Sequence, residues 1–252
     1  MTAVRSIALK ERFDPGGDKP LPPEPGSGGM AHLFVAGRPT GNYMQIVASL
    51  TDPSQAAAAH AAGAEILELR FDLMGGEPAE IVQQCRAVSS LPLIATYRSV
   101  QEGGKYFGSP GEWRDRIAPL IPLVDYVDVE QRFARESGAV KAAGKTIIAS
   151  HHAAEMLPLH VLFVLEQELR AYGDIPKIIV TPNNEDDLID LIAFTRAAKK
   201  PVCTGVMGSA FRYARAILPL FGSGLVYCHA GVPAAEGQYS VAEFVALRKL
   251  LL

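Results

Sequence analysis

The sequence predicts an α/β fold built as a single (β/α)8 TIM barrel. From residue 43 to residue 252, short apolar segments rich in β-branched residues alternate with longer helical segments. The alternation occurs eight times, and strands that alternate with helices are expected to lie parallel, joined by right-handed crossovers. The alternative is an open doubly wound sheet. Such a sheet usually carries a glycine-rich phosphate turn after its first strand, and Ser49-Leu50-Thr51-Asp52 is not one.

Each of the eight predicted strands is a short run of mainly apolar residues, as expected for parallel strands that are covered on both faces. In chain order they are residues 45–50, 65–70, 93–97, 126–130, 146–150, 178–181, 202–207 and 225–228.

Eight helices are predicted after these strands, and local signals mark two of their starts. The first helix follows Asp52-Pro53, which places proline in its first turn. Before the last helix, Ser240 is a candidate N-cap, and Glu243 three residues later completes a capping box. The predicted helices are residues 54–62, 79–89, 112–120, 133–143, 159–171, 185–198, 209–218 and 241–251.

The N-terminal part of the chain has a different composition. Five prolines and five glycines occupy the fifteen positions from Pro15 to Gly29. Proline lacks a backbone donor and glycine is costly to order. We therefore expect residues 1–42 to form a disordered extension or linker, and residues 43–252 to form the barrel.

Composition excludes several classes of function. The formal net charge of −3 provides no basic field for nucleic acid, and no apolar run approaches the roughly 18 residues of a membrane helix. Cys85, Cys203 and Cys228 are odd in number and far apart, so we expect neither a disulfide framework nor a cysteine metal site. No other metal-ligand spacing is present. These features indicate a soluble protein of a reducing compartment.

Charged residues occur where barrel strands should be apolar. Glu68, Arg70 and Asp72 share one parity, and because side chains alternate along a strand, all three point the same way. If the intervening Leu69 and Phe71 face the helices, the charged groups face the barrel axis or its mouth.

Other predicted strands repeat this feature with Arg98, Asp128, Glu130 and Lys177. Buried charges must pair with one another, because an isolated one is very costly. One interpretation is a purely structural ion-pair network inside the barrel. The other is a polar pocket at the carboxyl ends of the strands, where barrel enzymes place their chemistry.

Lys177 follows Ile175-Pro176 at the start of an apolar run. Beside other cations in a low-dielectric site, a lysine should have a lowered pKa, and its neutral amine can attack a carbonyl and form a Schiff base. The alternative is a lysine at a strand entry whose amine reaches water.

Further polar groups indicate the kind of ligand. One histidine of the adjacent pair His151-His152 is a candidate general acid or base. Arg70, Arg98 and Arg212 lie at or beyond strand ends, and guanidinium groups bind carboxylates bidentately. We therefore expect a small anionic substrate. Surface salt bridging is the alternative for these arginines, above all for Arg212.

Five motifs in order resemble one family. Together, they resemble type I 3-dehydroquinate dehydratase, the Schiff-base enzyme of the shikimate pathway, over about residues 45–252. The motifs are residues 68–72 (ELRFD), 96–104 (TYRSVQEGG), 126–130 (YVDVE), 176–177 (PK) and 236–240 (EGQYS).

The resemblance implies a cytoplasmic barrel, commonly a homodimer, that needs no metal or organic cofactor. It implies a hydro-lyase (EC 4.2.1.10) that converts 3-dehydroquinate to 3-dehydroshikimate and water on the route to chorismate and the aromatic amino acids. Lys177 would form the Schiff base, His152 would move the proton, and Glu102 would orient that histidine. The implied substrate-binding residues are Ser49, Glu68, Arg70, Arg98, Arg212 and Gln238.

Two positions depart from the family pattern. The family usually has Ser-x-His-Asp where this chain has Ser150-His151-His152-Ala153, and counting from Ser150 selects His152 whereas counting from Lys145 selects His151. The final loop usually reads Ser-Ala-Pro-Gly-Gln, but here Ala234 and Glu236 replace its serine and proline. A carboxylate in a loop that closes over an anion is expected to weaken binding.

Two other functions fit parts of the sequence. One is another lysine-dependent barrel aldolase or dehydratase that acts on a related keto acid. The other is a catalytically silent barrel that serves as a binding module, which only the altered final loop favours.

Overall fold

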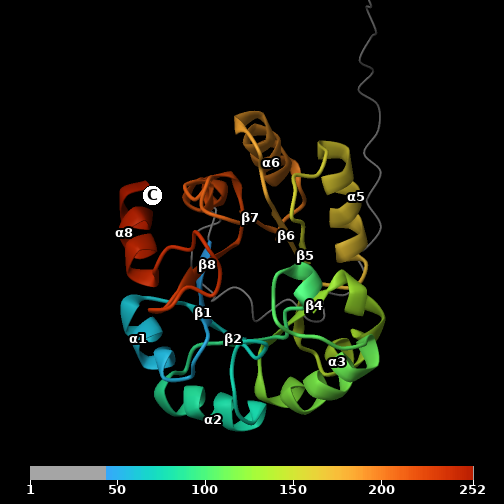
Figure 1. The fold of residues 1–252 in the computed structure, drawn as a ribbon, viewed down its shortest axis with the longest axis vertical. Coiled ribbons are helices and arrows are strands. Elements are labelled where there is room, and N and C mark those ends of the chain that lie inside the picture. Colours follow the sequence, from blue (N-terminus) through green and yellow to red (C-terminus); the bar gives the residue numbers. More distant parts are fainter. Residues whose placement is uncertain (1–43, 252) are drawn as a thin grey trace, which may run out of the picture. The chain divides into compact units, whose positions relative to one another are not determined.

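The computed structural model describes residues 44–251, in which strands and helices alternate as predicted (Figure 1). The predicted extension, residues 1–42, lies outside the described residues, so the division of the chain at residue 43 stays a prediction. The strands are β1 Gln45–Leu50, β2 Ile66–Arg70, β3 Leu93–Thr96, β4 Tyr126–Glu130, β5 Thr146–His152, β6 Ile175–Val180, β7 Cys203–Val206 and β8 Leu225–His229.

All eight strands belong to one parallel sheet in the order β7-β6-β5-β4-β3-β2-β1-β8. The first strand, β1, pairs with the last strand, β8, and the segment before β8 hydrogen-bonds to the segment before β7. The sheet therefore curls back on itself as a barrel and is not an open doubly wound sheet. Within residues 44–251, β7 and β8 are not joined by a ladder of backbone hydrogen bonds. The amide of Gly224 instead donates to the carbonyl of Val202 at 2.8 Å, and the Ser223 hydroxyl donates to the carbonyl of Thr204 at 3.0 Å. The barrel is therefore nearly closed.

Helices surround the strands (Figure 1). Two are at least five residues shorter than predicted: a 3-10 turn, Gln131–Glu136, precedes α4, and another, Leu218–Phe221, follows α7. Gly138 begins α4 at a high entropic cost, and Pro219 cannot donate the α-helical hydrogen bond that would extend α7. The helices are α1 Gln55–Ala62, α2 Pro78–Val88, α3 Pro110–Ile117, α4 Gly138–Ala142, α5 Leu159–Arg170, α6 Glu185–Ala197, α7 Ala214–Ile217 and α8 Val241–Leu251.

The predicted capping box before α8 is confirmed. The Ser240 amide donates to the Glu243 carboxylate at 2.7 Å, and the Glu243 amide donates to the Ser240 hydroxyl at 3.2 Å. These bonds satisfy two backbone donors that the first turn of a helix leaves free. The box fixes where the chain leaves the loop after β8 and enters α8.

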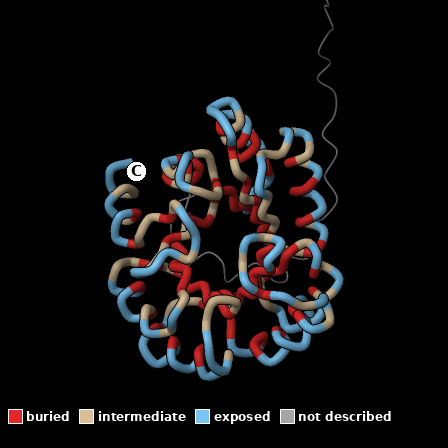
Figure 2. The backbone as a smooth tube through the Cα atoms, viewed as in Figure 1, coloured by how far each residue is buried: buried red, intermediate tan, exposed pale blue. Residues whose placement is uncertain are grey.

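Buried residues form the inner ring of strands and the inward faces of the helices (Figure 2). Leu67 and Leu69 of β2 belong to the apolar layer between strands and helices, whereas Glu68 and Arg70 alternate with them and line a cavity. The prediction that the apolar side chains of β2 face the helices while its charged side chains face the barrel interior is therefore confirmed. Among the described residues, no helix has the length and apolar character needed to cross a membrane.

Candidate active site

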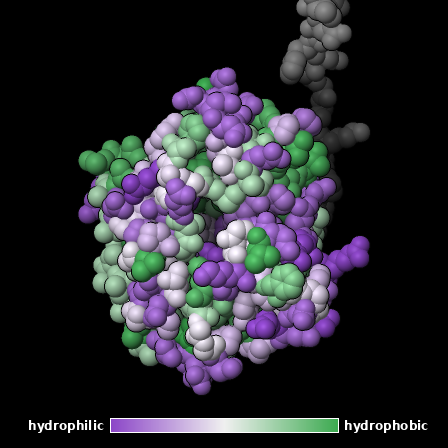
Figure 3. Space-filling model, viewed as in Figure 1, coloured by the Kyte–Doolittle hydropathy of each residue, from purple (hydrophilic) through white to green (hydrophobic). Residues whose placement is uncertain are grey.

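One cavity brings together residues from the carboxyl ends of the strands and the loops that follow them. The space-filling view shows a hollow near the middle of this face of the molecule (Figure 3). Eight of the nine residues predicted for the site line the cavity; Arg212 does not. The eight are Ser49, Glu68, Arg70, Arg98, Glu102, His152, Lys177 and Gln238.

Lys177 lies inside the barrel. β6 begins at Ile175, three residues earlier than predicted, so Lys177 is its third residue and is only 4% exposed. The alternative of an amine that reaches water is therefore wrong. Its Nζ donates to Oδ2 of Asp128 at 3.1 Å and lies 3.8 Å from Oε1 of Glu68. These close charged neighbours are carboxylates rather than the cations that the sequence suggested.

Glu68 is held in place by two hydroxyl groups. Ser49 Oγ donates to Glu68 Oε2 at 2.5 Å, and Thr96 Oγ1 donates to Glu68 Oε1 at 3.0 Å. The register places Ser49 directly beside Glu68 on the adjacent strand, so the fold itself sets up this contact. The carboxylate therefore faces Lys177 in a fixed orientation.

His152 is the last residue of β5, and its Nδ1 lies 2.8 Å from Oε2 of Glu102, in the 3-10 turn after β3. Burial lowers the pKa of His152 well below its usual value, and the neighbouring cations of Arg98 and Lys177 act in the same direction. Burial raises the pKa of Glu102 to about 8, against the opposing effect of Arg98. His151 does not line the cavity, so only His152 is placed for chemistry there.

Arg98 is the centre of a buried ion-pair network. Its Nη1 donates to Glu102 at 2.9 Å and to Glu130 and Ser150 at 3.0 Å each. Its Nη2 lies 2.8 Å from Oδ1 of Asp128. The structural network and the polar pocket that the sequence offered as alternatives are thus one arrangement, which lines the cavity and also fixes its acidic groups.

Arg70 is held in a similar way at the end of β2. Its Nε and Nη2 donate to the two oxygens of Asp72 at 2.8 Å each, which is a bidentate pair. The Lys105 amide also donates to Asp72, at 3.1 Å. The guanidinium plane is therefore oriented before any ligand arrives.

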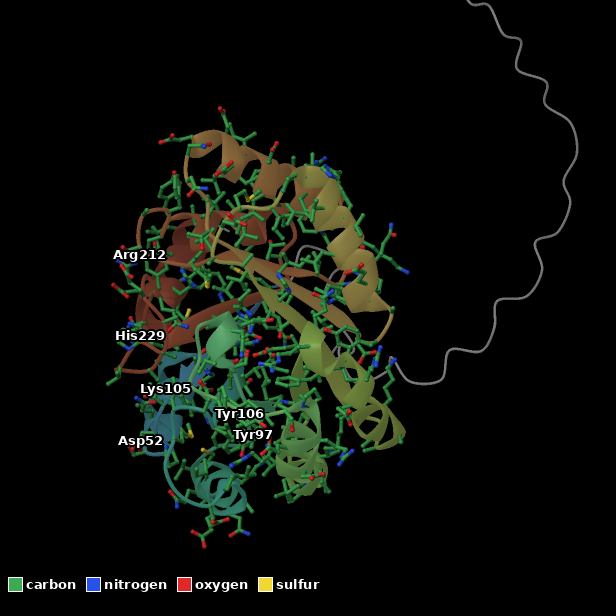
Figure 4. The ribbon with its side chains drawn as sticks, turned by 45° about the vertical axis from the view of Figure 1, so that its right-hand side comes forward. Asp52, Tyr97, Lys105, Tyr106, Arg212 and His229 are labelled. Carbon is green, nitrogen blue, oxygen red and sulfur yellow. The ribbon has the colours of Figure 1, made fainter. Side chains whose placement is uncertain are left out.

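Arg212 lies away from the cavity. Its guanidinium packs over the Tyr239 ring, 4.0 Å from the centroid, and lies 3.4 Å from Glu243. Figure 4 shows Arg212 at the outer edge of the molecule. Because residues before Ala214 form turns rather than the predicted helix, the loop backbone directs this side chain outward.

Arg215, which the sequence analysis missed, lines the cavity instead. Its Nη2 donates to the backbone carbonyl of Glu236 at 3.2 Å, and its buried Nε has no hydrogen-bond partner within residues 44–251. Burial lowers the pKa of this guanidinium. Arg70 and Arg98 have carboxylate partners, whereas Arg215 has none among the residues that the structure describes. The sequence offers no signal that separates Arg215 from Arg212, one helical turn earlier.

The loop after β8 closes one side of the cavity. Gln238 Oε1 accepts hydrogen bonds from the amides of Ala234 and Ala235 at 2.9 and 3.1 Å, and all three residues line the cavity. The Glu236 carboxylate accepts a hydrogen bond from the Ser209 hydroxyl at 2.6 Å and does not line the cavity. This carboxylate therefore points to the neighbouring loop and not into the cavity, and its expected effect on anion binding stays a prediction.

A close approach of backbone joins the same two loops. Gly237 has a φ of +76°, and a Cβ at this position would lie 2.2 Å from the carbonyl oxygen of Gly208. Only glycine fits there without displacing the loop that carries Ser209. No group of three or more histidine, cysteine or acidic side chains within residues 44–251 is arranged to hold a metal ion.

Comparisons with known proteins identify the family. Residues 46–251 match the family described as type I 3-dehydroquinase. The 3-dehydroquinate dehydratase of Methanoregula boonei is 81% identical over 208 residues, which cover 82% of this chain and all of that relative. That of Methanospirillum hungatei is 37% identical, over 82% of this chain and 81% of the relative.

Solved structures agree. The 3-dehydroquinate dehydratase of Aquifex aeolicus has 29% identity and a TM-score of 0.72, with 82% of this chain and 98% of that one covered. The type I enzyme of Clostridium difficile with covalently modified comenic acid has 25% identity and a TM-score of 0.75, with 83% and 92% covered. The match of sequence and fold shows that this chain belongs to the type I 3-dehydroquinase family.

Proposed function

We propose that this chain is a 3-dehydroquinate dehydratase that works through a Schiff base on Lys177. The activity follows from the family to which the chain belongs. The observation that supports the covalent route is the buried Lys177 amine, which lines the same cavity as the His152–Glu102 pair. An amine and a proton carrier that face one cavity are the two groups such a dehydration requires.

The reaction proceeds in balanced steps. Lys177 first passes one proton to its carboxylate neighbour Asp128, and the neutral amine adds to the ketone carbon. Loss of water, with that proton returned, gives a protonated iminium. The iminium draws electrons from the adjacent C–H, and His152 removes that proton to leave a neutral enamine. The enamine expels the β-hydroxyl, which leaves as water after His152 returns the proton. Water then hydrolyses the new iminium, and this step releases 3-dehydroshikimate and returns Lys177 as its ammonium form.

Glu102 sets the working form of His152. When Glu102 is ionised, its Oε2 accepts a hydrogen bond from Nδ1–H of His152, so Nε2 carries the lone pair that takes the proton. The low pKa of His152 keeps the imidazole neutral near pH 7. Once Glu102 has ionised, the pair is ready to act as a base first and as an acid afterwards.

The charges of the cavity orient the substrate. Four acidic side chains, Glu68, Glu102, Asp128 and Glu130, surround only two cations, Lys177 and Arg98. An anionic carboxylate is disfavoured in that acidic region.

We assign the carboxylate instead to Arg215, which carries out the role that the sequence suggested for Arg212, because its buried charge has no acidic partner in residues 44–251. The ketone then points toward Lys177. Ser49, Glu68, Arg70 and Gln238 line the same cavity, which supports a role for them in binding the substrate hydroxyls.

Borohydride trapping tests the covalent route. Wild-type protein incubated with 3-dehydroquinate and sodium borohydride should gain one ligand mass, and peptide mapping should place it on Lys177. Lys177→Ala should show neither adduct nor turnover. Turnover by the wild type without any adduct would refute the Schiff base. The same trap with related keto acids separates this reaction from that of another lysine-dependent aldolase or dehydratase. The homodimer and the cytoplasmic location stay predictions.

A further inference from the structure

Tyr227 contacts the reactive nitrogen, and neither a motif nor a charge pattern in the sequence singles it out. It lies in the middle of β8 and lines the cavity. The Nζ of Lys177 lies over its ring, 3.8 Å from the centroid. β6 and β8 are not neighbours in the sheet, so this contact crosses the interior of the barrel.

The ring face completes the surroundings of the amine. Asp128 and Glu68 approach Nζ as hydrogen-bond and ion-pair partners at 3.1 and 3.8 Å, and the ring covers a further side. An aromatic face stabilises a cation that lies over it, most strongly where water is excluded. The protonated iminium keeps a positive charge on the same nitrogen, whereas the carbinolamine before it and the enamine after it are neutral there.

The phenol hydroxyl plays no evident part in this contact. It is buried and has no hydrogen-bond partner among residues 44–251. Burial raises the pKa of Tyr227 well above its usual value, so the phenol stays protonated and the ring stays neutral. The π face is therefore the feature that Tyr227 presents to Lys177.

We propose that the aromatic face of Tyr227 is a catalytic element of this site: it holds Nζ of Lys177 in position and stabilises the protonated iminium relative to the neutral carbinolamine. This inference rests on the proposed Schiff-base function.

Three variants separate the ring face from the hydroxyl and from general packing. Tyr227→Phe keeps the face and removes only an unpartnered oxygen, so it should retain kcat within about threefold. Tyr227→Leu removes the face and should lower kcat by about 30-fold, equivalent to about 2 kcal/mol, with KM changed by less than about threefold. Tyr126→Leu makes a similar cavity at a buried position of β4 that does not line the site, and serves as the packing control.

Borohydride trapping at saturating substrate measures the iminium itself. The trapped fraction should fall in Tyr227→Leu and remain near the wild-type value in Tyr227→Phe and Tyr126→Leu. Thermal unfolding verifies that each variant is folded. If Tyr227→Leu does not fold, Tyr227→Met replaces it, because methionine fills more of the space and also lacks a ring.

The outcomes distinguish this inference from the proposed function. If the wild type is not trapped, the Schiff base itself fails. If the wild type is trapped but Tyr227→Leu matches Tyr227→Phe in kcat and trapped fraction, the ring face has no role. Equal losses in Tyr227→Phe and Tyr227→Leu would assign the effect to the hydroxyl and would also overturn the proposal.

Discussion

Replacing Glu102 with glutamine should stabilise the fold at alkaline pH while it lowers activity. Glu102 is buried beside Arg98 and His152, and the amide keeps its size and its ability to accept a hydrogen bond. Arg98 retains Asp128 and Glu130 as partners, so no unpaired cation is created. The main change is that the side chain can no longer ionise.

The magnitude follows from the pKa of Glu102. Burial raises it from 4.5 to about 8. Between these values, the native protein holds a proton that the unfolded chain has released, so raising the pH lowers the free energy of unfolding. One pH unit corresponds to about 1.4 kcal/mol, so the window of about 3.5 units (8 minus 4.5) amounts to roughly 5 kcal/mol as an upper limit. The Glu102→Gln variant does not lose this free energy of unfolding, because glutamine does not ionise.

Urea unfolding of both proteins at a series of pH values from 5 to 9 measures the difference. The free energy of unfolding of Glu102→Gln relative to wild type should increase with pH up to about 8 and then remain constant. Other titrating groups cancel in this comparison because both proteins contain them. A difference that does not vary with pH would refute a raised pKa for Glu102.

Three further predictions concern activity. In steady-state assays, wild-type kcat/KM should rise as pH increases through about 8, because ionised Glu102 orients the imidazole base; a similar rise in Glu102→Gln would contradict this. Arg215→Met should raise KM about 100-fold and Arg212→Met less than about threefold, and equal effects would refute the assignment of the carboxylate. Glu236→Ala should raise KM about fivefold by freeing the loop from Ser209, whereas Glu236→Gln, which keeps an acceptor, should not.

The barrel could be predicted because its signal is local and repeated. Charged and apolar residues alternate at Glu68, Leu69 and Arg70. This alternation predicts which side of the strand faces the barrel axis, and it does not depend on the rest of the chain. Helix lengths were harder to predict. The short α7 results from a turn before Ala214 and from Pro219 after it, and the conformation of such a turn depends on the loops packed against it.

The same limit explains which site residues were found. Glu68 and Arg70 lie on β2 and line the cavity, as their shared parity predicted, because side-chain direction on a strand follows from position along it. Arg215 was missed because it follows a loop, and no periodic pattern in the sequence predicts the backbone path of a loop. The contact of Tyr227 with Lys177 could not be predicted either, since it joins two strands that are not neighbours and exists only once the barrel has curled.

The junction between β7 and β8 is the place in the described barrel wall where no backbone ladder joins neighbouring strands. Elsewhere in the described ring, neighbouring strands separate only if a run of backbone hydrogen bonds breaks. Here the links include the bond from the Gly224 amide and the two bonds that the Ser223 hydroxyl makes with the backbone of Thr204. Transient opening should concentrate at this junction. Arg215 follows β7 and Gln238 follows β8, and two hydrogen bonds to Glu236 join their loops. An opening that also breaks these bonds would separate the two walls of the cavity and give a bound carboxylic acid a route to solvent.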